Sequence, residues 1–195
     1  MQNTIRKNTK KLTYLAILSA LVIILQILAI FLRTVGFAPS LVLVPVVLGA
    51  ALFGPSAGAW LGFVFGMAVL ISGDAAAFLS INAFGTVATV LLKGTAAGYL
   101  SGVIYKLFEK INKTLAVFAA AIVCPLVNTG IFLLGSLVFF LDTIKMWAEG
   151  AGFGANWGAY MIIGLVGTNF LFELALNVIL SPTVVRLLGI VKKNK

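Results

Sequence analysis

Long apolar stretches alternate with short polar or Gly/Pro-containing breaks along the whole chain. The first stretch, Leu12 to Leu32, is long enough to cross a bilayer as a single helix, and five further stretches follow it. The pattern therefore predicts one all-α membrane domain with six transmembrane helices. The expected spans are residues 12–32, 41–53, 56–71, 84–105, 115–141 and 158–182.

Composition agrees with a membrane protein and narrows the chemistry. Hydrophobic residues make up 62% of the chain, charged residues make up 10%, and the mean hydropathy is +1.15. There is no His and one Cys, which excludes His-dependent catalysis and any Cys-based metal motif. No phosphate-binding GxxxxGK[ST] motif occurs. We therefore expect a non-enzymatic protein without a cofactor or a metal site.

The basic residues give the expected orientation in the membrane. The net charge is +9, and the Lys and Arg residues gather near both termini and after the fourth predicted helix. The opposite side carries Arg33 and Lys145, while Lys93 lies inside a predicted helix. The positive-inside rule then places both termini in the cytoplasm. The charges are thus topology signals beside a lipid bilayer and not a nucleic-acid surface.

Glycines recur at every fourth position in the third and fourth predicted helices. They are Gly54, Gly58, Gly62 and Gly66, then Gly94, Gly98 and Gly102. A ridge without side chains lets another helix approach closely, so both ridges predict tight helix packing.

The last predicted helix carries a polar stripe at four-residue spacing, formed by Asn169, Glu173 and Asn177. A carboxylate at membrane depth is costly and marks a candidate functional site. Counting along the helices places Asn169 level with Lys93 and Asn128 in the outer half, with Glu173 one turn deeper. This predicts a pocket open to the outside with Glu173 as its floor, and Asn177 as a hydrogen-bonding contact between helices.

Each of these polar residues also has a structural interpretation. Lys93 and Glu173 could form an ion pair that only stabilises the fold, and the two Asn side chains of the pocket could join helices by hydrogen bonds. Trp147, in the polar, Gly-rich segment 142–156, could cover a ligand or lie at the membrane interface. Asp74 is expected to be a solvated charge in a loop.

The order of these features resembles the substrate-binding S components of energy-coupling factor (ECF) vitamin transporters. The resemblance covers nearly the whole chain. It depends on six spans, on Ala16-x-x-x-Ala20, and on the polar last helix. It also depends on the segments LVPVVLGAALFGPSAGAWLGFVFG (43–66) and GTVATVLLKGTAAGYLSGVIYK (85–106).

The resemblance implies a subunit of a prokaryotic cell membrane that captures a vitamin and is energised by partners. The partners would be a membrane scaffold protein and two cytoplasmic ATPases. Ala16 and Ala20 would contact the scaffold, and the segment Arg33–Ser40 would gate the site. The implied substrate-binding candidates are Lys93, Asn128, Trp147, Asn169, Glu173 and Arg33.

The substrate is predicted from charge. Arg33, Lys93 and Lys145 lie in the outer half and could neutralise a carboxylate, which suits pantothenate best and folate next. Riboflavin and a pyridoxine or pyrimidine precursor remain alternatives within the family. A stand-alone secondary transporter is the alternative outside it.

Overall fold

The computed structural model describes the backbone of residues 2–34 and 41–193, and the side chains of these ranges except 2–7, 32–34, 168, 192 and 193. All regular structure within the described ranges is helical. The elements are α1 (Gln2–Thr34), α2 (Leu43–Phe53), α3 (Pro55–Ile71), α4 (Ala76–Leu79), α5 (Ala83–Phe108), α6 (Lys113–Phe139), α7 (Leu141–Gly150), α8 (Trp157–Ala159), the π-helical η1 (Tyr160–Val166) and α9 (Gly167–Lys193). The expected all-α fold is confirmed for these residues.

Four helices contain stretches long and apolar enough to cross a membrane. These stretches are Asn8–Phe31, Ala83–Phe108, Lys113–Phe139 and Asn169–Val191. The second and third expected spans are shorter: α2 has 11 residues and α3 has 17, or about 17 Å and 26 Å at the rise of an α-helix. A hydrocarbon core is about 30 Å thick. The described helices thus include four candidate spans, and six spans with cytoplasmic termini remain a prediction.

The short helix α2 lies at the centre of the bundle. Its sequence LVPVVLGAALF has no polar side chain, and Leu43, Val46 and Ala50 are fully buried. It packs against α1, α3, α5, α6 and α9. A helix that is apolar on every side is stable only where protein surrounds it, which explains this position.

The helices α3 and α5 touch backbone to backbone. A Cβ atom added at Gly58 would meet the carbonyl oxygen of Gly98, and one added at Gly62 would meet that of Gly94. The predicted tight packing of both glycine ridges is therefore confirmed. We call this contact the glycine seam.

The polar, Gly-rich segment 142–156, which lies between two predicted spans, was expected to be a loop, and the structure corrects this because the segment is partly helical. Residues 141–150 form α7, which buries Ile144 and Ala148 on one side and exposes Asp142 and Lys145 on the other. Apolar residues at this four-residue spacing suit a helix that lies across the end of a bundle. The turns after α7 contain Gly152 and Gly154 with positive φ.

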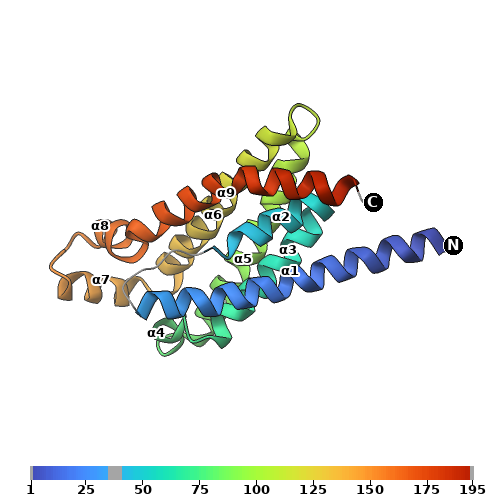
Figure 1. The fold of residues 1–195 in the computed structure, drawn as a ribbon. Helices are drawn as coiled ribbons and strands as arrows, with labels where there is room; N and C mark the ends of the chain where they lie inside the picture. Colours follow the sequence, from blue (N-terminus) through green and yellow to red (C-terminus); the bar gives the residue numbers. More distant parts are fainter. Residues whose placement is uncertain (1, 35–40, 194–195) are drawn as a thin grey trace.

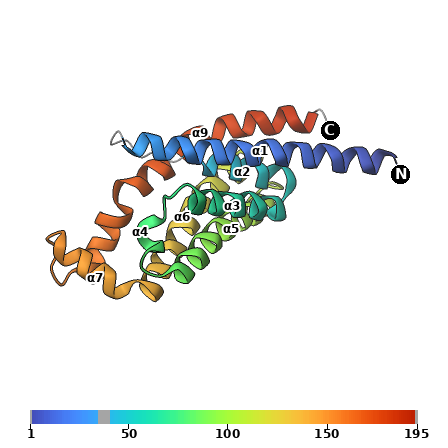
Figure 2. The ribbon, with the colours of Figure 1, turned by 90° about the horizontal axis from the view of Figure 1, so that it is seen from below.

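The last span was predicted as one helix over residues 158–182, and this was wrong. The chain forms α8, then η1, and α9 begins at Gly167, whose φ of 44° and ψ of −140° favour glycine. The Gly167 N–H donates to the Ile162 carbonyl, five residues back, as a π-helix requires. Figure 2 shows the resulting bend in the last apolar segment.

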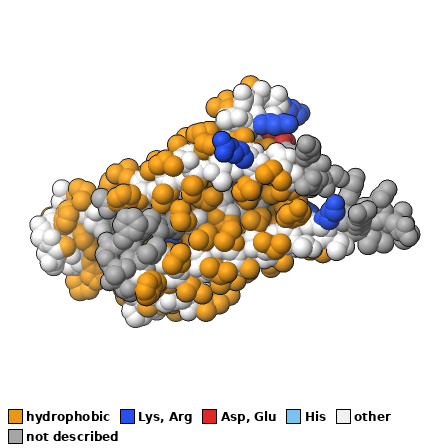
Figure 3. Space-filling view, in the orientation of Figure 1, with side chains coloured by type: hydrophobic (Ala, Val, Ile, Leu, Met, Phe, Trp, Pro, Cys, Tyr) orange, Lys and Arg blue, Asp and Glu red, His pale blue; other side chains and the backbone are white. Residues whose placement is uncertain are grey.

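The two ends of the molecule differ. Both termini lie at one end in Figure 1, and α4, α7 and α8 lie at the other. Figure 3 shows hydrophobic side chains over the flank between the ends, and the exposed side chains include Ile24, Leu134 and Ile179. An apolar flank of this kind suits contact with lipid tails.

Candidate functional site

The candidate site is a cavity of about 290 Å³ at the end of the molecule that carries α4 and α7. We call it the larger cavity, because a smaller one adjoins it. Its walls come from α3, the turn before α4, α4, α5, α6 and the segment around η1 and α9. The volume is near the lower limit of ordinary ligand pockets, which is about 300 Å³. The larger cavity therefore suits a small molecule.

Three polar side chains of α5 line the larger cavity: Thr86, Thr89 and Lys93. Their three- and four-residue spacing keeps them on one face of the helix. The Asn82 side chain caps α5 by accepting the Gly85 N–H at 2.9 Å, and the Thr86 hydroxyl donates to the Asn82 carbonyl at 2.8 Å. The cap thus fixes the end of α5 that carries this polar face.

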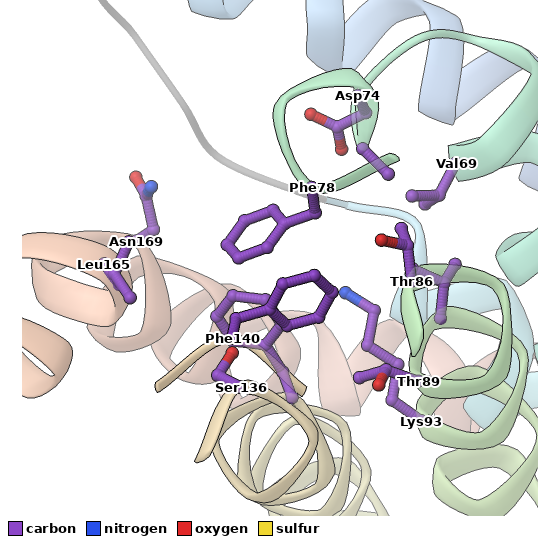
Figure 4. A pocket seen from close by; sticks show the side chains of 13 residues that line it. Val69, Asp74, Phe78, Thr86, Thr89, Lys93, Ser136, Phe140, Leu165 and Asn169 are labelled. Carbon is purple, nitrogen blue, oxygen red and sulfur yellow. The ribbon is translucent and has the colours of Figure 1, made fainter. Parts of the chain in front are cut away.

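The Lys93 amino group points into the larger cavity (Figure 4). Side chains of a helix lean toward its N-terminus, so Lys93 extends toward the end where Thr86 lies. Its Nζ lies 5.3 Å from the ring centroid of Phe132 and 5.9 Å from that of Phe65, within the range of cation–π attraction. The aromatic rings thus hold a positive charge at the cavity surface.

An aromatic cluster closes the α4 side of the cavity. The Phe78 ring makes edge contacts with Phe132, Phe140 and Trp147 at centroid distances of 5.7, 5.0 and 5.4 Å. Phe78, Phe132 and Phe140 line the larger cavity, and Trp147 of α7 lies behind Phe78. Edge-to-face packing of this kind gives the cavity an apolar wall that could contact an alkyl chain.

Asp74 corrects the expectation of a solvated loop charge. Its carboxylate accepts a hydrogen bond of 3.1 Å from Nε2 of Gln26, a side chain of α1 that is only 2% exposed. Asp74 also lines the larger cavity. A polar side chain buried inside α1 needs a partner, and the turn before α4 supplies one.

A second, smaller cavity of about 110 Å³ adjoins the first. The two share Lys93, Phe132, Leu165 and Asn169, and Asn128 and Glu173 line only the smaller one. On α6, Asn128, Phe132 and Ser136 follow at four-residue spacing, so they form one column. Ser136 faces the larger cavity, Asn128 faces the smaller one, and Phe132 lies between them.

The three residues of the polar stripe on α9 differ in their exposure. Asn169 is exposed, whereas Glu173 is 9% and Asn177 is 2% exposed. Nδ2 of Asn177 donates to the Glu173 carbonyl at 2.8 Å, and the Ser181 hydroxyl donates to the Asn177 carbonyl at 2.8 Å. The Asn177 Nδ2 group thus bonds to its own helix, because the carbonyl one turn back lies within its reach. The sequence had predicted a hydrogen bond to a neighbouring helix instead.

Several buried polar atoms of the described residues have no hydrogen-bond partner in the protein. Oγ1 of Thr89 and Oγ of Ser136 belong to residues that line the larger cavity, and Oδ1 of Asn128 belongs to a residue that lines the smaller one. The others are on Ser101 and Asn177, which line neither cavity. An unpaired buried polar atom costs about 1–3 kcal/mol, so such atoms in a cavity wall indicate a site for a polar ligand.

The structure brings together four of the six predicted binding residues. Lys93, Asn128, Asn169 and Glu173 all line the smaller cavity, and Lys93 and Asn169 also line the larger one. Trp147 is one ring away from the larger cavity, through Phe78. The side chain of Arg33 lies outside the described residues, as does most of the predicted gate, Arg33–Ser40.

Sequence reasoning missed much of the larger cavity. Thr86 and Thr89 precede Lys93 by seven and four residues, and Ser136 follows Asn128 by eight. Helical spacing would have placed Thr86 and Thr89 on the Lys93 face of one helix. It would also have placed Ser136 on the Asn128 face of the next helix. Small hydroxyl side chains are common in membrane helices, and their chemistry alone does not mark a site.

These observations define an all-helical membrane protein with a polar cavity for a small molecule near one end. The family model for the ECF transporter, substrate-specific component, matches residues 10–185. The chain belongs to this family, whose members are the non-catalytic, substrate-binding components of a transporter. Comparison with curated proteins and with solved structures gave no match.

Proposed function

We propose that this chain captures pantothenate at the outer face of a prokaryotic plasma membrane, as the binding subunit of an ATP-driven importer. The observation that carries this proposal is the amino group of Lys93, which points into the larger cavity beside the rings of Phe65 and Phe132. A cation in such an apolar setting attracts a carboxylate more strongly than it would in water. A small carboxylate is therefore the preferred ligand.

Cavity size favours pantothenate among the candidate vitamins. A site of about 290 Å³ with an adjoining one of about 110 Å³ suits a short, flexible acid. Folate has a carboxylate but is considerably larger, and riboflavin carries a wide ring system. A pyridoxine or pyrimidine precursor is small, but it lacks the charge that Lys93 would pair with.

The position of the cavity supports capture from outside. The larger cavity lies at the end that carries α4 and α7, away from the termini with their Lys and Arg residues. By the positive-inside rule the end with the termini is cytoplasmic. The sequence lacks a Walker-type ATP site, so the energy would come from two cytoplasmic ATPases through a membrane scaffold subunit.

The expected docking surface for the scaffold is on α1. Ala16 and Ala20 follow at four-residue spacing and both are exposed, with Ile17 and Ile24 beside them. Small residues on an exposed helix face allow a second helix to approach closely in a membrane. This surface supports the proposed contact with the scaffold.

Calorimetric titration of the detergent-purified protein tests the substrate. Pantothenate should bind, and folate, riboflavin and pyridoxine should bind far more weakly. Lys93→Ala should weaken pantothenate binding far more than Glu173→Ala does. Equal loss of folding in both variants would favour a structural ion pair instead, and vitamin uptake by vesicles that contain this chain alone would favour a secondary transporter.

A further inference from the structure

The two cavities differ in the hydrogen-bonding groups that they offer. The larger one has the Lys93 ammonium group and two unpaired hydroxyls, Oγ1 of Thr89 and Oγ of Ser136, all of which can donate. The smaller one has the Glu173 carboxylate and the unpaired Oδ1 of Asn128, which accept. Lys93 also lines the smaller cavity, and Asp74, whose carboxylate accepts from Gln26, also lines the larger one. The cavities therefore differ in their unpaired atoms, which are two hydroxyls beside the larger cavity and one amide oxygen beside the smaller.

Lys93 and Phe132 lie where the two cavities meet, because both residues line both. The Lys93 Nζ lies 5.3 Å from the Phe132 ring centroid. A ligand that extends through both cavities must therefore pass this ring. An uncharged middle section that can lie against an aromatic face fits this position better than a second charge does.

We propose that the two cavities hold opposite ends of one ligand and so fix its orientation. The carboxylate binds in the larger cavity to Lys93, Thr89 and Ser136, and a hydroxyl- or N–H-bearing end binds in the smaller cavity to Asn128 and Glu173. In the reverse orientation the ligand carboxylate would meet the Glu173 carboxylate and the unpaired acceptor Oδ1 of Asn128, which repel it in a poorly solvated setting. In the proposed orientation it meets two unpaired hydroxyls, and the carboxylate of that cavity, Asp74, already accepts a hydrogen bond from Gln26. This inference depends on the proposed function, since pantothenate has a carboxylate and two hydroxyls at opposite ends of an amide.

The unpaired atoms also affect the stability of the empty protein, which can be measured without a ligand. Thr89, Ser136 and Asn128 are 6%, 0% and 6% exposed, so their unpaired atoms cost the empty protein free energy. Replacing a hydroxyl by an apolar group of similar shape removes that cost. If Thr89 and Ser136 serve a ligand, their apolar variants fold at least as stably as the wild type while binding less well.

The test titrates three compounds into the purified full-length chain. They are pantothenate, its alcohol analogue with CH₂OH in place of the carboxylate, and an N-acyl-β-alanine of the same skeleton without the hydroxyls. The variants are Thr89→Val with Ser136→Ala, and Asn128→Leu. Ser101→Ala is the matched control, because Ser101 is also buried and unpaired but lines neither cavity.

Each variant should affect one end of the ligand. The Thr89/Ser136 variant should weaken pantothenate binding about tenfold or more and change binding of the alcohol analogue by less than about threefold. Asn128→Leu should weaken pantothenate binding about tenfold and leave the compound without hydroxyls unaffected. Ser101→Ala should change none of them, and the melting temperature of the empty Thr89/Ser136 variant should not fall.

Four outcomes would contradict the proposal, in three different ways. Both variants weakening all three compounds equally, or the opposite pairing of variant and compound, would overturn the orientation alone. A lower melting temperature of the empty Thr89/Ser136 variant would show a structural role for these hydroxyls and overturn their assignment. A wild-type protein that binds none of the compounds would overturn the proposed substrate, and the orientation with it.

Discussion

The two faces of α5 serve opposite purposes. On one face, Gly94 and Gly98 meet Gly62 and Gly58 of α3 so closely that no Cβ atom fits between the helices. On the other face, Thr86, Thr89 and Lys93 line an open cavity of about 290 Å³. The first contact has neither open space nor polar side chains, and the second has both.

This difference indicates how a small membrane protein can hold a binding site. Open space and unpaired polar atoms cost stability, and closely packed backbones provide van der Waals contacts that offset the cost. Because both faces belong to one helix, the glycine seam also fixes the position of Lys93. The same helix therefore supplies the rigid support and the binding groups.

The largest expected effect comes from breaking the glycine seam. Gly62→Val would place side-chain atoms against the Gly94 carbonyl and should cost about 3 kcal/mol or more, seen as a lower melting temperature in detergent. Gly130→Ala is the control, because a Cβ atom at Gly130 of α6 meets nothing within 4 Å. A variant at Gly62 that melts like the control would show that the helices separate without cost.

The next largest effect concerns the charge on the other face of α5. Lys93→Met keeps the aliphatic stem but removes the ammonium group, and should weaken pantothenate binding about tenfold to a hundredfold while the protein still folds. Lys106→Met, on an exposed Lys of the same helix, is the control. Unchanged binding in the Lys93 variant would show that the carboxylate of the ligand does not bind in the larger cavity.

A smaller effect of opposite sign is expected for the unpaired hydroxyls. Thr89→Val should stabilise the empty protein by up to about 1 kcal/mol, or about 2–4 °C in melting temperature, because an unsatisfied donor is removed. The added methyl group replaces a hydroxyl of similar size beside Gly135. A clear loss of stability would show that the Thr89 hydroxyl contributes to helix packing and not to the binding cavity.

The smallest effect on the isolated protein is expected from the exposed small residues of α1. Ala16→Trp with Ala20→Trp should leave melting temperature and pantothenate binding unchanged, because both positions are exposed. Transport by the full complex should be lost, because the bulky rings would keep a partner helix away. Normal uptake by cells with this variant would exclude the proposed docking surface.

Much of the fold could be predicted from spacing. The glycines at every fourth position predicted the seam, and the apolar stretches located α2, α3, α5 and α6 within three residues at each end. The helix α1 begins ten residues before its predicted span, and α9 ends eleven residues after the last one. Residues 141–150 and Gly167 were missed for different reasons, one in the packing and one in the backbone. The helix α7 needs the bundle end to bury Ile144, and the break at Gly167 is a backbone conformation within an apolar stretch.

Less of the candidate site could be predicted. Lys93, Asn128, Asn169 and Glu173 were chosen because charges and amides at membrane depth are costly, and they line one cavity. Asp74 was misjudged because its partner, Gln26, is 48 positions away in the sequence. Hydroxyls such as Ser136 become notable only when the structure shows that they lack a partner.

The central claim is that the cavity beside Lys93 captures a small carboxylate from outside the cell. Mass spectrometry of the ligand that stays with the protein through purification in mild detergent tests this most directly. The wild-type chain should retain a small carboxylic acid, with pantothenate as the expected mass, and Lys93→Met should retain little or none. An uncharged compound in the wild-type protein, or an empty wild-type protein, would contradict the claim.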